Sequence, residues 1–276
     1  MGSRLIGSGA IGYRSPIRGW RTDPCLRRTI KGMPILGVIF DLGSTLIHRT
    51  GLELEKEKCG ALAGIAAARW GCRAPAALAA RLLEIRLDAW RRSDEDLVEH
   101  PAARSIAQAF REAGLPTGGE ILLKAEAVFF EPEVRASRLY PGATGALETV
   151  RAMGLRVGMI SNATSHNLIL DITTKLGIRE YFDPLVTSAG FGRIKPHPAI
   201  FAHVLDAWGI AGGAAVMIGD TLRADIQGAH EAGMRSILVD IEPNPANAGF
   251  DGPATPTARV TALAEVPDVI RRWAAA

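Results

Sequence analysis

The sequence predicts an α/β protein: a parallel sheet core with an inserted, all-helical cap domain. Two short apolar runs, 38–40 and 216–219, each lead directly into an aspartate, as expected of buried parallel strands. From residue 140 onward, apolar runs alternate with helical segments, which indicates right-handed strand–helix–strand units. Between the first strand and this region, 49–139 has a helical pattern without interruption by a strand, and we expect it to form the cap.

The individual elements follow from apolar periodicity and from turn signals. We expect strands at 35–40, 155–160, 184–188, 214–218 and 235–239. Helices are expected across 52–135, with breaks near Gly71, Pro75, Pro101 and 114–116, and at 143–153, 165–176, 198–208, 223–232 and 261–273. Glycines that typically end helices stand at Gly154, Gly177 and Gly233. The proline-rich stretch 242–256 is expected to be an irregular surface connection.

The charge distribution separates the first 32 residues from the rest of the chain. They hold seven basic residues and one acidic residue, which leaves 25 basic and 28 acidic residues in the remainder. This composition is also found in organellar transit peptides, but Met33-Pro34 resembles a natural start, which favours a disordered extension. We therefore expect an extension at 1–32, a core domain at 33–48 and 140–276, and a cap domain at 49–139.

Composition argues against several classes of protein. The chain is 47% hydrophobic and 22% charged, and charged residues interrupt every apolar stretch of membrane-spanning length. The mildly acidic body gives no support to nucleic-acid binding. The three cysteines, Cys25, Cys59 and Cys72, are too few and too irregularly spaced for a disulfide framework or a zinc site. A cytoplasmic location is therefore expected.

The two aspartates at the strand ends are the first candidate site residues. Ligands of open α/β sheets bind outside the carboxyl ends of the strands, where Asp41 and Asp220 are expected to meet. A pair of carboxylates there offers the oxygen ligands that Mg²⁺ prefers. Asp41 could also be the N-cap residue of a helix, but Asp220 on the companion strand favours the role in the site.

Four ordered motifs extend this pattern. They are Asp41-Leu-Gly-Ser-Thr45-Leu, Ser161-Asn162 after a strand, Lys195-Pro-His-Pro198 and Gly219-Asp220-Thr-Leu-Arg-Ala-Asp225. With them, residues 34 to 240 resemble the haloacid dehalogenase-like (HAD) hydrolase superfamily, in the subfamily with a C1-type helical cap. The resemblance implies a Rossmann-like core and an enzyme that acts through a covalent aspartyl-phosphate.

The resemblance implies a role for each motif residue in binding and catalysis. Asp41 would be the nucleophile that attacks phosphorus. Lys195 would neutralise charge between Asp41 and the phosphoryl oxygens. Ser161 and the backbone N–H of Asn162 would bind a phosphoryl oxygen, although the same pair could cap the following helix.

The metal ligands are implied in the same way. Mg²⁺ would be bound by Asp41, the backbone carbonyl of Gly43, Asp220 and Asp225. An acidic residue such as Asp225 is also common in the first turn of an ordinary helix, where the helix dipole favours it. Asp220 is therefore the stronger of the two downstream candidates.

The sequence departs from the family pattern at Gly43. The family's phosphatases usually have an aspartate there that serves as general acid and base, a role worth about 10²–10⁴ in rate. Three interpretations stay open. The first is a phosphatase that uses good leaving groups or another proton donor; His48 is nearest in sequence, although a solvated turn histidine is the simpler interpretation. The second is a dehalogenase or phosphonate hydrolase, and the third is a catalytically silent phosphate- or partner-binding protein.

Further residues help to discriminate between these interpretations. The metal carboxylates Asp220 and Asp225 argue against a dehalogenase, which needs no Mg²⁺. A phosphonate hydrolase needs a cap lysine for a Schiff base; the candidates are Lys56, Lys58 and Lys124, and charged cap residues usually face solvent. The arginines Arg81, Arg86, Arg91 and Arg92 are expected on a solvated face, and the aromatic residues Trp70, Trp90, Phe110, Phe129 and Phe130 between cap helices.

We predict a Mg²⁺-dependent phosphatase of a small phosphorylated metabolite. It is expected to be a monomer or a homodimer, with no nucleic-acid or membrane partner.

Overall fold

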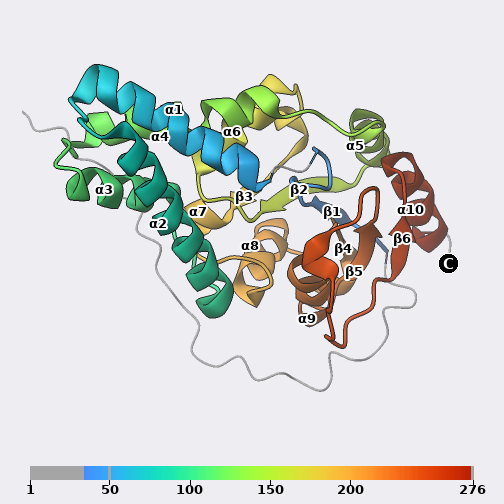
Figure 1. The fold of residues 1–276 in the computed structure, drawn as a ribbon. Coiled ribbons are helices and arrows are strands. Elements are labelled where there is room, and N and C mark those ends of the chain that lie inside the picture. The colour runs from blue at the N-terminus through green and yellow to red at the C-terminus, as the bar shows by residue number, and fades with distance from the viewer. Residues whose placement is uncertain (1–33, 49–50, 275–276) are drawn as a thin grey trace, which may run out of the picture.

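The computed structural model describes residues 34–48 and 51–274, so the predicted extension at 1–32 lies outside the described residues. Within the described part of the chain, six strands form one sheet in the order β3-β2-β1-β4-β5-β6 (Figure 1). Every neighbouring pair is parallel. The predicted parallel sheet is therefore confirmed.

The strands are β1 (Gly37–Phe40), β2 (Arg156–Ser161), β3 (Leu185–Thr187), β4 (Ala215–Gly219), β5 (Arg235–Val239) and β6 (Ala258–Val260). The first five confirm the predicted strands, with ends shifted by at most two residues. The sequence analysis missed β6, whose three residues are too few to show an apolar alternation.

Helices cover both faces of the sheet. They are α5 (Ala143–Ala152), α6 (His166–Lys175), α7 (Ser188–Phe191), α8 (Pro198–Trp208), α9 (Gly228–Glu231) and α10 (Val266–Ala274). The helix predicted at 223–232 is instead a π-helical turn, η4 (Leu222–Gln227), followed by the short α9. The closing helix predicted at 261–273 begins only at Val266, after the 3₁₀ turn η6 (Leu263–Glu265).

Side-chain alternation along β1 builds the two layers. Val38 and Phe40 pack in the core cluster that contains residues of α5, α6 and α10, whereas Ile39 packs against α8 on the other face. Trp208, at the end of α8, lies close to the backbones of β1 and β2. A Cβ at Gly37 would lie 2.5 Å from the Trp208 ring, and a Cβ at Gly158 would lie 2.8 Å from it. These strand glycines therefore allow α8 to approach the sheet closely.

Four helices stand between β1 and α5 in the chain, and we call them the cap helices: α1 (Leu52–Trp70), α2 (Pro75–Asp96), α3 (Ala102–Glu112) and α4 (Gly119–Ala136). They confirm the helical prediction for 52–135 and its breaks, and they lie together at one side of the sheet (Figure 1). The division into a core at 33–48 and 140–276 and a cap at 49–139 stays a prediction. Within the described ranges, no helix has the length and apolar character needed to cross a bilayer.

The segment after α2 joins the cap helices to the core. Val98 forms an isolated antiparallel bridge with Arg193, and the N–H of Ile194 donates to the carbonyl of Leu97 at 3.2 Å. Beside them, the Ser188 hydroxyl donates to a carboxylate oxygen of the buried Glu99 at 2.5 Å. Burial raises the pKa of Glu99, against the hydrogen bond from Ser188. These contacts hold the cap helices over the carboxyl edge of the sheet.

Candidate active site

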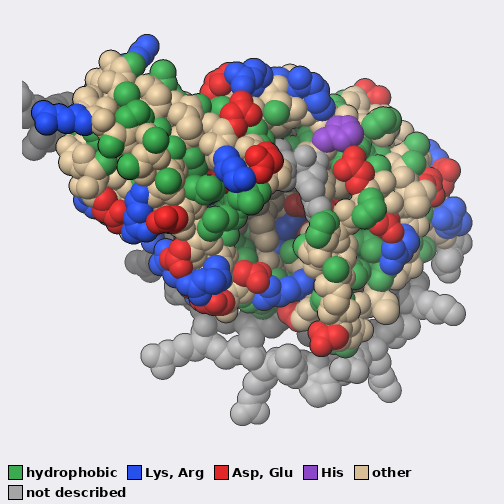
Figure 2. Space-filling model, viewed as in Figure 1, with side chains coloured by type: hydrophobic (Ala, Val, Ile, Leu, Met, Phe, Trp, Pro, Cys, Tyr) green, Lys and Arg blue, Asp and Glu red, His purple; other side chains and the backbone are tan. Residues whose placement is uncertain are grey.

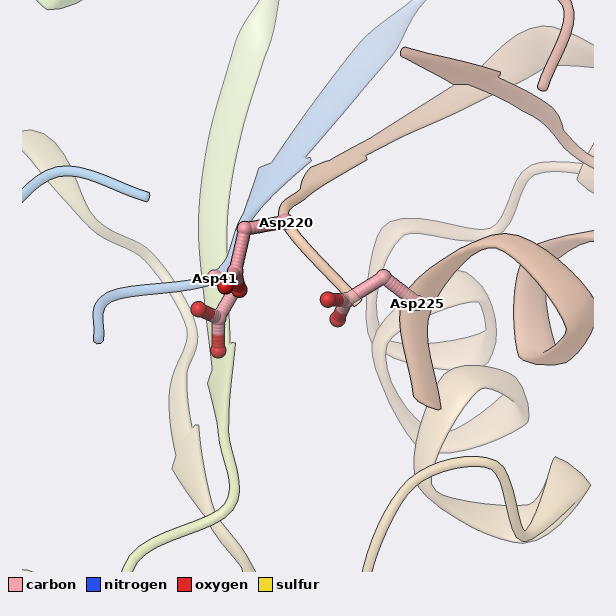
Figure 3. Close-up of side chains that lie close together, drawn as sticks. All are labelled: Asp41, Asp220 and Asp225. Atoms are coloured by element: carbon pink, nitrogen blue, oxygen red, sulfur yellow. The ribbon is translucent and has the colours of Figure 1, made fainter. Parts of the chain in front are cut away.

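Three aspartates converge at the carboxyl edge of the sheet. β1 and β4 are hydrogen-bonded neighbours, and Asp41 and Asp220 follow directly after them. Figure 3 shows their carboxylates next to each other, with Asp225 pointing toward them from η4. One carboxylate oxygen from each residue lies within 4.8 Å of the other two. The sheet therefore brings together the carboxylates that the sequence analysis singled out.

The wide turn of η4 carries Asp225 back toward the strand end. The carbonyl of Thr221 accepts from the N–H groups of both Asp225 and Ile226, and the Thr221 N–H donates to Asp225 Oδ2 at 3.0 Å. Only a glycine fits at position 219, because a Cβ there would lie 2.2 Å from Cγ of Asp225. Asp225 is 1% exposed. Asp225 does stand in the first turn of η4, as the alternative interpretation had it, but its carboxylate is buried at the site and not solvated.

Lys195 lies between two of these carboxylates. Its Nζ is 2.7 Å from Asp41 Oδ1 and 2.6 Å from Asp225 Oδ1, and the side chain is buried. Asn162 fixes the backbone at this position: its Oδ1 accepts from the Lys195 N–H at 2.7 Å and its Nδ2 donates to the Lys195 carbonyl at 3.0 Å. The Asn162 side chain thus holds the lysine loop in place.

Ser161 is the last residue of β2 and is buried at the same edge. The alternative role of Ser161-Asn162 as the cap of the next helix is wrong. Ser165 caps α6 instead, by accepting from the N–H of Leu168 at 3.3 Å. Ser161 and Asn162 thus remain at the strand end, where both line a cavity.

Burial and neighbouring charges perturb the carboxylates of Asp220 and Asp225. Burial, Asp41 and Asp225 raise the pKa of Asp220 to about 7. Burial also raises the pKa of Asp225 to about 6, against the attraction of Lys195. Burial alone would lower the pKa of Lys195, but Asp225 and Asp41 outweigh it and the pKa is raised. The site therefore concentrates negative charge that the single ammonium group only partly balances.

One cavity of about 490 Å³ joins the predicted site residues. Its lining includes Asp41, Gly43, Ser161, Asn162, Lys195, Asp220 and Asp225. Figure 2 shows the hollow between the cap helices and the sheet. Gly43 is exposed in it, and a Cβ at this position would meet no atom within 4 Å. The position of the missing family aspartate is thus open space.

The cap side of the cavity carries a buried ion network that the sequence analysis did not foresee. Lys58 Nζ lies 2.5 Å from Glu55 Oε2 and 2.7 Å from Glu133 Oε2. Arg86 pairs with Glu55 at 2.8 Å and donates to Thr164 of the core at 3.0 Å. The expectation that these cations face solvent is wrong for Lys58 and Arg86, which are 4% and 1% exposed.

The remaining cap residues follow the expectation more closely. Arg81, Arg91 and Arg92 are about half exposed. Phe110, Phe129 and Phe130 are buried in the hydrophobic core, and Phe130 also lines the cavity. Trp90 departs from the expectation, because it is 37% exposed and lines the cavity. The cavity thus has a mixed aromatic and charged wall opposite the carboxylates.

The sequence analysis also missed the loop 242–247 as part of the site. Asn244 Nδ2 donates to Asp220 Oδ2 at 2.6 Å, and Asn247 Nδ2 donates to the Asp220 carbonyl at 2.8 Å. On the other side, the hydroxyl of Thr45 donates to Asp41 Oδ2 at 3.1 Å. Asparagine in a proline-rich loop is ordinary turn chemistry, so the sequence contained no signal for these contacts. Thr45 stood within the first motif without an assigned role.

The chain is similar to curated phosphatases over part of its length. Over 161 residues the chain is 34% identical to phosphoserine phosphatase of Thermus thermophilus, a match covering 58% of this chain and 62% of that protein. It is 31% identical over 124 residues to phosphoglycolate phosphatase of Nitrosococcus oceani, covering 44% and 54% of the two chains. The chain thus spans little more than half the length of these curated relatives.

Solved structures match over more of the chain. The 2-haloacid dehalogenase of Pseudomonas syringae superposes with a TM-score of 0.66 at 27% identity, covering 87% of this chain and 99% of that one. A HAD phosphatase of Thermococcus onnurineus, at 21% identity and a TM-score of 0.57 over 86% and 98% of the two chains, shows the same fold. Residues 35–233 match the haloacid dehalogenase-like hydrolase family itself, so the chain belongs to this family of hydrolases.

Proposed function

We propose that this hydrolase is a Mg²⁺-dependent phosphatase of small phosphorylated metabolites. The observation that carries the proposal is the placement of Asp220. Its carboxylate lies beside Asp41 in a buried site, and the pKa of Asp220 is raised to about 7 by burial and by its neighbours. Such repulsion is unfavourable unless a cation is bound between the carboxylates.

The donor set fits Mg²⁺. Asp41, Asp220, Asp225 and the carbonyl of Gly43 offer hard oxygen ligands, and each of these residues lines the cavity. When bound, the ion would polarise a phosphoryl oxygen and neutralise charge that develops there. Asn244 and Thr45 would keep the carboxylates of Asp220 and Asp41 aimed at the ion.

The protein groups supply the remaining steps. Asp41 attacks phosphorus, and the resulting aspartyl-phosphate is then hydrolysed by water. Lys195, held between Asp41 and Asp225, neutralises the phosphoryl oxygens as the charge redistributes. Ser161 and the N–H of Asn162 contact the same group from the end of β2. The cap helices cover the site and exclude bulk water.

A dehalogenase is the second candidate, because the chain is 27% identical to the 2-haloacid dehalogenase of Pseudomonas syringae over most of its length. The empty position at Gly43 is compatible with this reaction. Displacement at carbon, however, gains nothing from Asp220, which would repel the carboxylate of a haloacid. We therefore favour the phosphatase.

The ion network under the cap helices weakens the case for a phosphonate hydrolase. Lys58 is the one of the three candidate Schiff-base lysines that lines the cavity, and its Nζ is held in ion pairs with Glu55 and Glu133. A Schiff base needs an amine that is free to attack a carbonyl carbon, and this one is engaged by two carboxylates, so a phosphonate hydrolase is disfavoured. A catalytically silent protein is disfavoured as well, because it would have no use for the Lys195 and Asp225 arrangement beside Asp41.

The test is hydrolysis of p-nitrophenyl phosphate with and without Mg²⁺. Asp41→Asn should abolish turnover, whereas Asp171→Asn, at an exposed position of α6 outside the cavity, should leave it unchanged. EDTA should stop the reaction and Mg²⁺ should restore it. Chloride release from a 2-haloacid in the presence of EDTA would favour the dehalogenase, and full activity of Asp41→Asn would remove the proposed nucleophile. The proposal retains a cytoplasmic monomer or homodimer without nucleic-acid or membrane partners.

A further inference from the structure

We propose that His48, oriented by Glu242, is the acid–base group that replaces the aspartate missing at position 43. This inference rests on the proposed phosphatase function and identifies the proton donor for the same site. It starts from the geometry of the cavity, in which position 43 is open and carries no side chain.

The titratable side chains of the cavity leave few candidates for this role. Among the described residues that line it, the three aspartates and Lys195 belong to the nucleophile and metal site. The other charged groups, Glu55, Lys58, Arg86 and Glu133, are tied to one another in the ion network under the cap helices. His48 is the remaining titratable side chain of this lining, and it belongs to neither group.

His48 is held in one orientation by three contacts. Its ring packs on Tyr140 with a centroid distance of 4.1 Å, and its backbone N–H donates to the carbonyl of Arg138 at 3.0 Å. Its Nδ1 lies 3.3 Å from Glu242 Oε1. When Nδ1–H donates to this carboxylate, Nε2 is the nitrogen available for proton transfer.

The loop that carries Glu242 links the contact with His48 to the metal site. Both side chains are about half exposed, and such a pair alone contributes little to stability. Glu242, however, belongs to the loop whose next polar residue, Asn244, binds Asp220. The same loop thus positions both the metal carboxylate and the histidine at the cavity.

The proposed steps balance in atoms and charge. Asp41 attacks phosphorus; the bond from phosphorus to the ester oxygen breaks with its electron pair on that oxygen, and the protonated His48 gives its Nε2 proton to it. The alcohol leaves. Neutral His48 then takes a proton from the water that attacks the aspartyl-phosphate, which releases phosphate, frees Asp41 and restores the imidazolium. Glu242 holds the Nδ1 side of the ring in both steps, so that Nε2 faces the reacting oxygen.

The test compares kcat/KM for an aryl ester with kcat/KM for alkyl esters. p-Nitrophenolate leaves without a proton, whereas the alkoxides of phosphoserine and phosphoglycolate need one. His48→Gln should lower kcat/KM for the two alkyl esters by about 10²-fold and leave that for p-nitrophenyl phosphate nearly unchanged. Glu242→Gln should lower the alkyl values by about tenfold, because it weakens the contact that orients the ring but leaves the imidazole in place. His230→Gln, at an exposed site of α9, is the matched control.

A chemical rescue separates catalysis from structure. In His48→Ala, added imidazole should restore hydrolysis of the alkyl esters, which a merely structural role would not allow. Equal losses for aryl and alkyl esters, no loss for either, or no rescue would overturn the role of His48, as would a wild-type protein active on the aryl ester alone. A wild-type protein that hydrolyses no phosphoester with Mg²⁺ would overturn the proposed function itself, and this role with it.

Discussion

Restoring the family aspartate at position 43 tests how the site supplies its proton. A Cβ at Gly43 would meet no atom within 4 Å, and Gly43 is not among the residues with a left-handed backbone. The Cβ of an aspartate therefore fits at this position without displacing a neighbour or straining the backbone. The backbone carbonyl of residue 43 stays in place. We expect the Gly43→Asp protein to fold and to keep its metal site.

The size of the effect depends on whether another acid is already present. In the His48→Gln background, Gly43→Asp should raise kcat/KM for phosphoserine by about 10²-fold, which corresponds to about 2.7 kcal/mol of transition-state stabilisation. In the wild-type background the gain should stay below about tenfold, because His48 already gives the proton. Asp41 and Asp220 line the same cavity as the new carboxyl group, and their negative charge favours its protonated form.

The assay is a double-mutant cycle of the wild type, both single variants and the double variant. Gly43→Ala serves as the control, because it adds the Cβ without the carboxyl group. The reasoning would be refuted if Gly43→Asp raised the wild-type rate by the full 10²-fold while His48→Gln changed nothing. That result would mean that the acid role is empty in this protein.

Four further predictions concern the metal site and the contact between cap and core. Mg²⁺ should raise Tm more at about pH 8 than at about pH 6, because Asp220, with a pKa of about 7, must lose its proton to bind the ion; equal shifts in differential scanning fluorimetry would contradict this. Without Mg²⁺, stability should fall as the pH rises toward 7, because the folded state retains protons that the unfolded chain has lost. Asn244→Ala should raise the Mg²⁺ concentration for half-maximal turnover by about tenfold; an unchanged Mg²⁺ titration would remove Asn244 as the residue that positions Asp220. Glu99→Gln should increase the free energy of unfolding more above neutral pH than at pH 5, because the raised pKa of Glu99 makes wild-type stability fall as pH rises through it; parallel urea denaturation curves at both pH values would argue against this.

The sequence predicted the sheet and the strand-end residues well because both depend on local patterns. β1 and β4 are short apolar runs, and parallel strands bring the residues at their carboxyl ends to one edge of the sheet. The placement of Asp41 and Asp220 is a consequence of that rule alone. The cap helices were equally predictable, because their periodicity and their glycine and proline breaks are local signals.

Burial of charge in the cap was not predictable from local signals. Arg86 stands in a run of arginines that are otherwise about half exposed, and its burial depends on Glu55, Thr164 and the ring of Trp90. Glu55 lies 31 residues away along the chain and Thr164 lies 78 residues away. A single sequence does not show which arginine faces these partners, and composition alone favours solvent for all of them.

The path of the chain after Asp41 bears most directly on whether Gly43 disables the site. Gly43 and Ile47 form a bridge, and Ile47 pairs with Leu139, so the segment folds back at the edge of the cavity. This return brings His48, seven positions after the nucleophile, to the same cavity as Asp41. A proton donor is required near the leaving oxygen, not at a fixed distance along the chain. The glycine at position 43 is therefore no argument for inactivity, since the turn after it supplies a histidine that Glu242 orients.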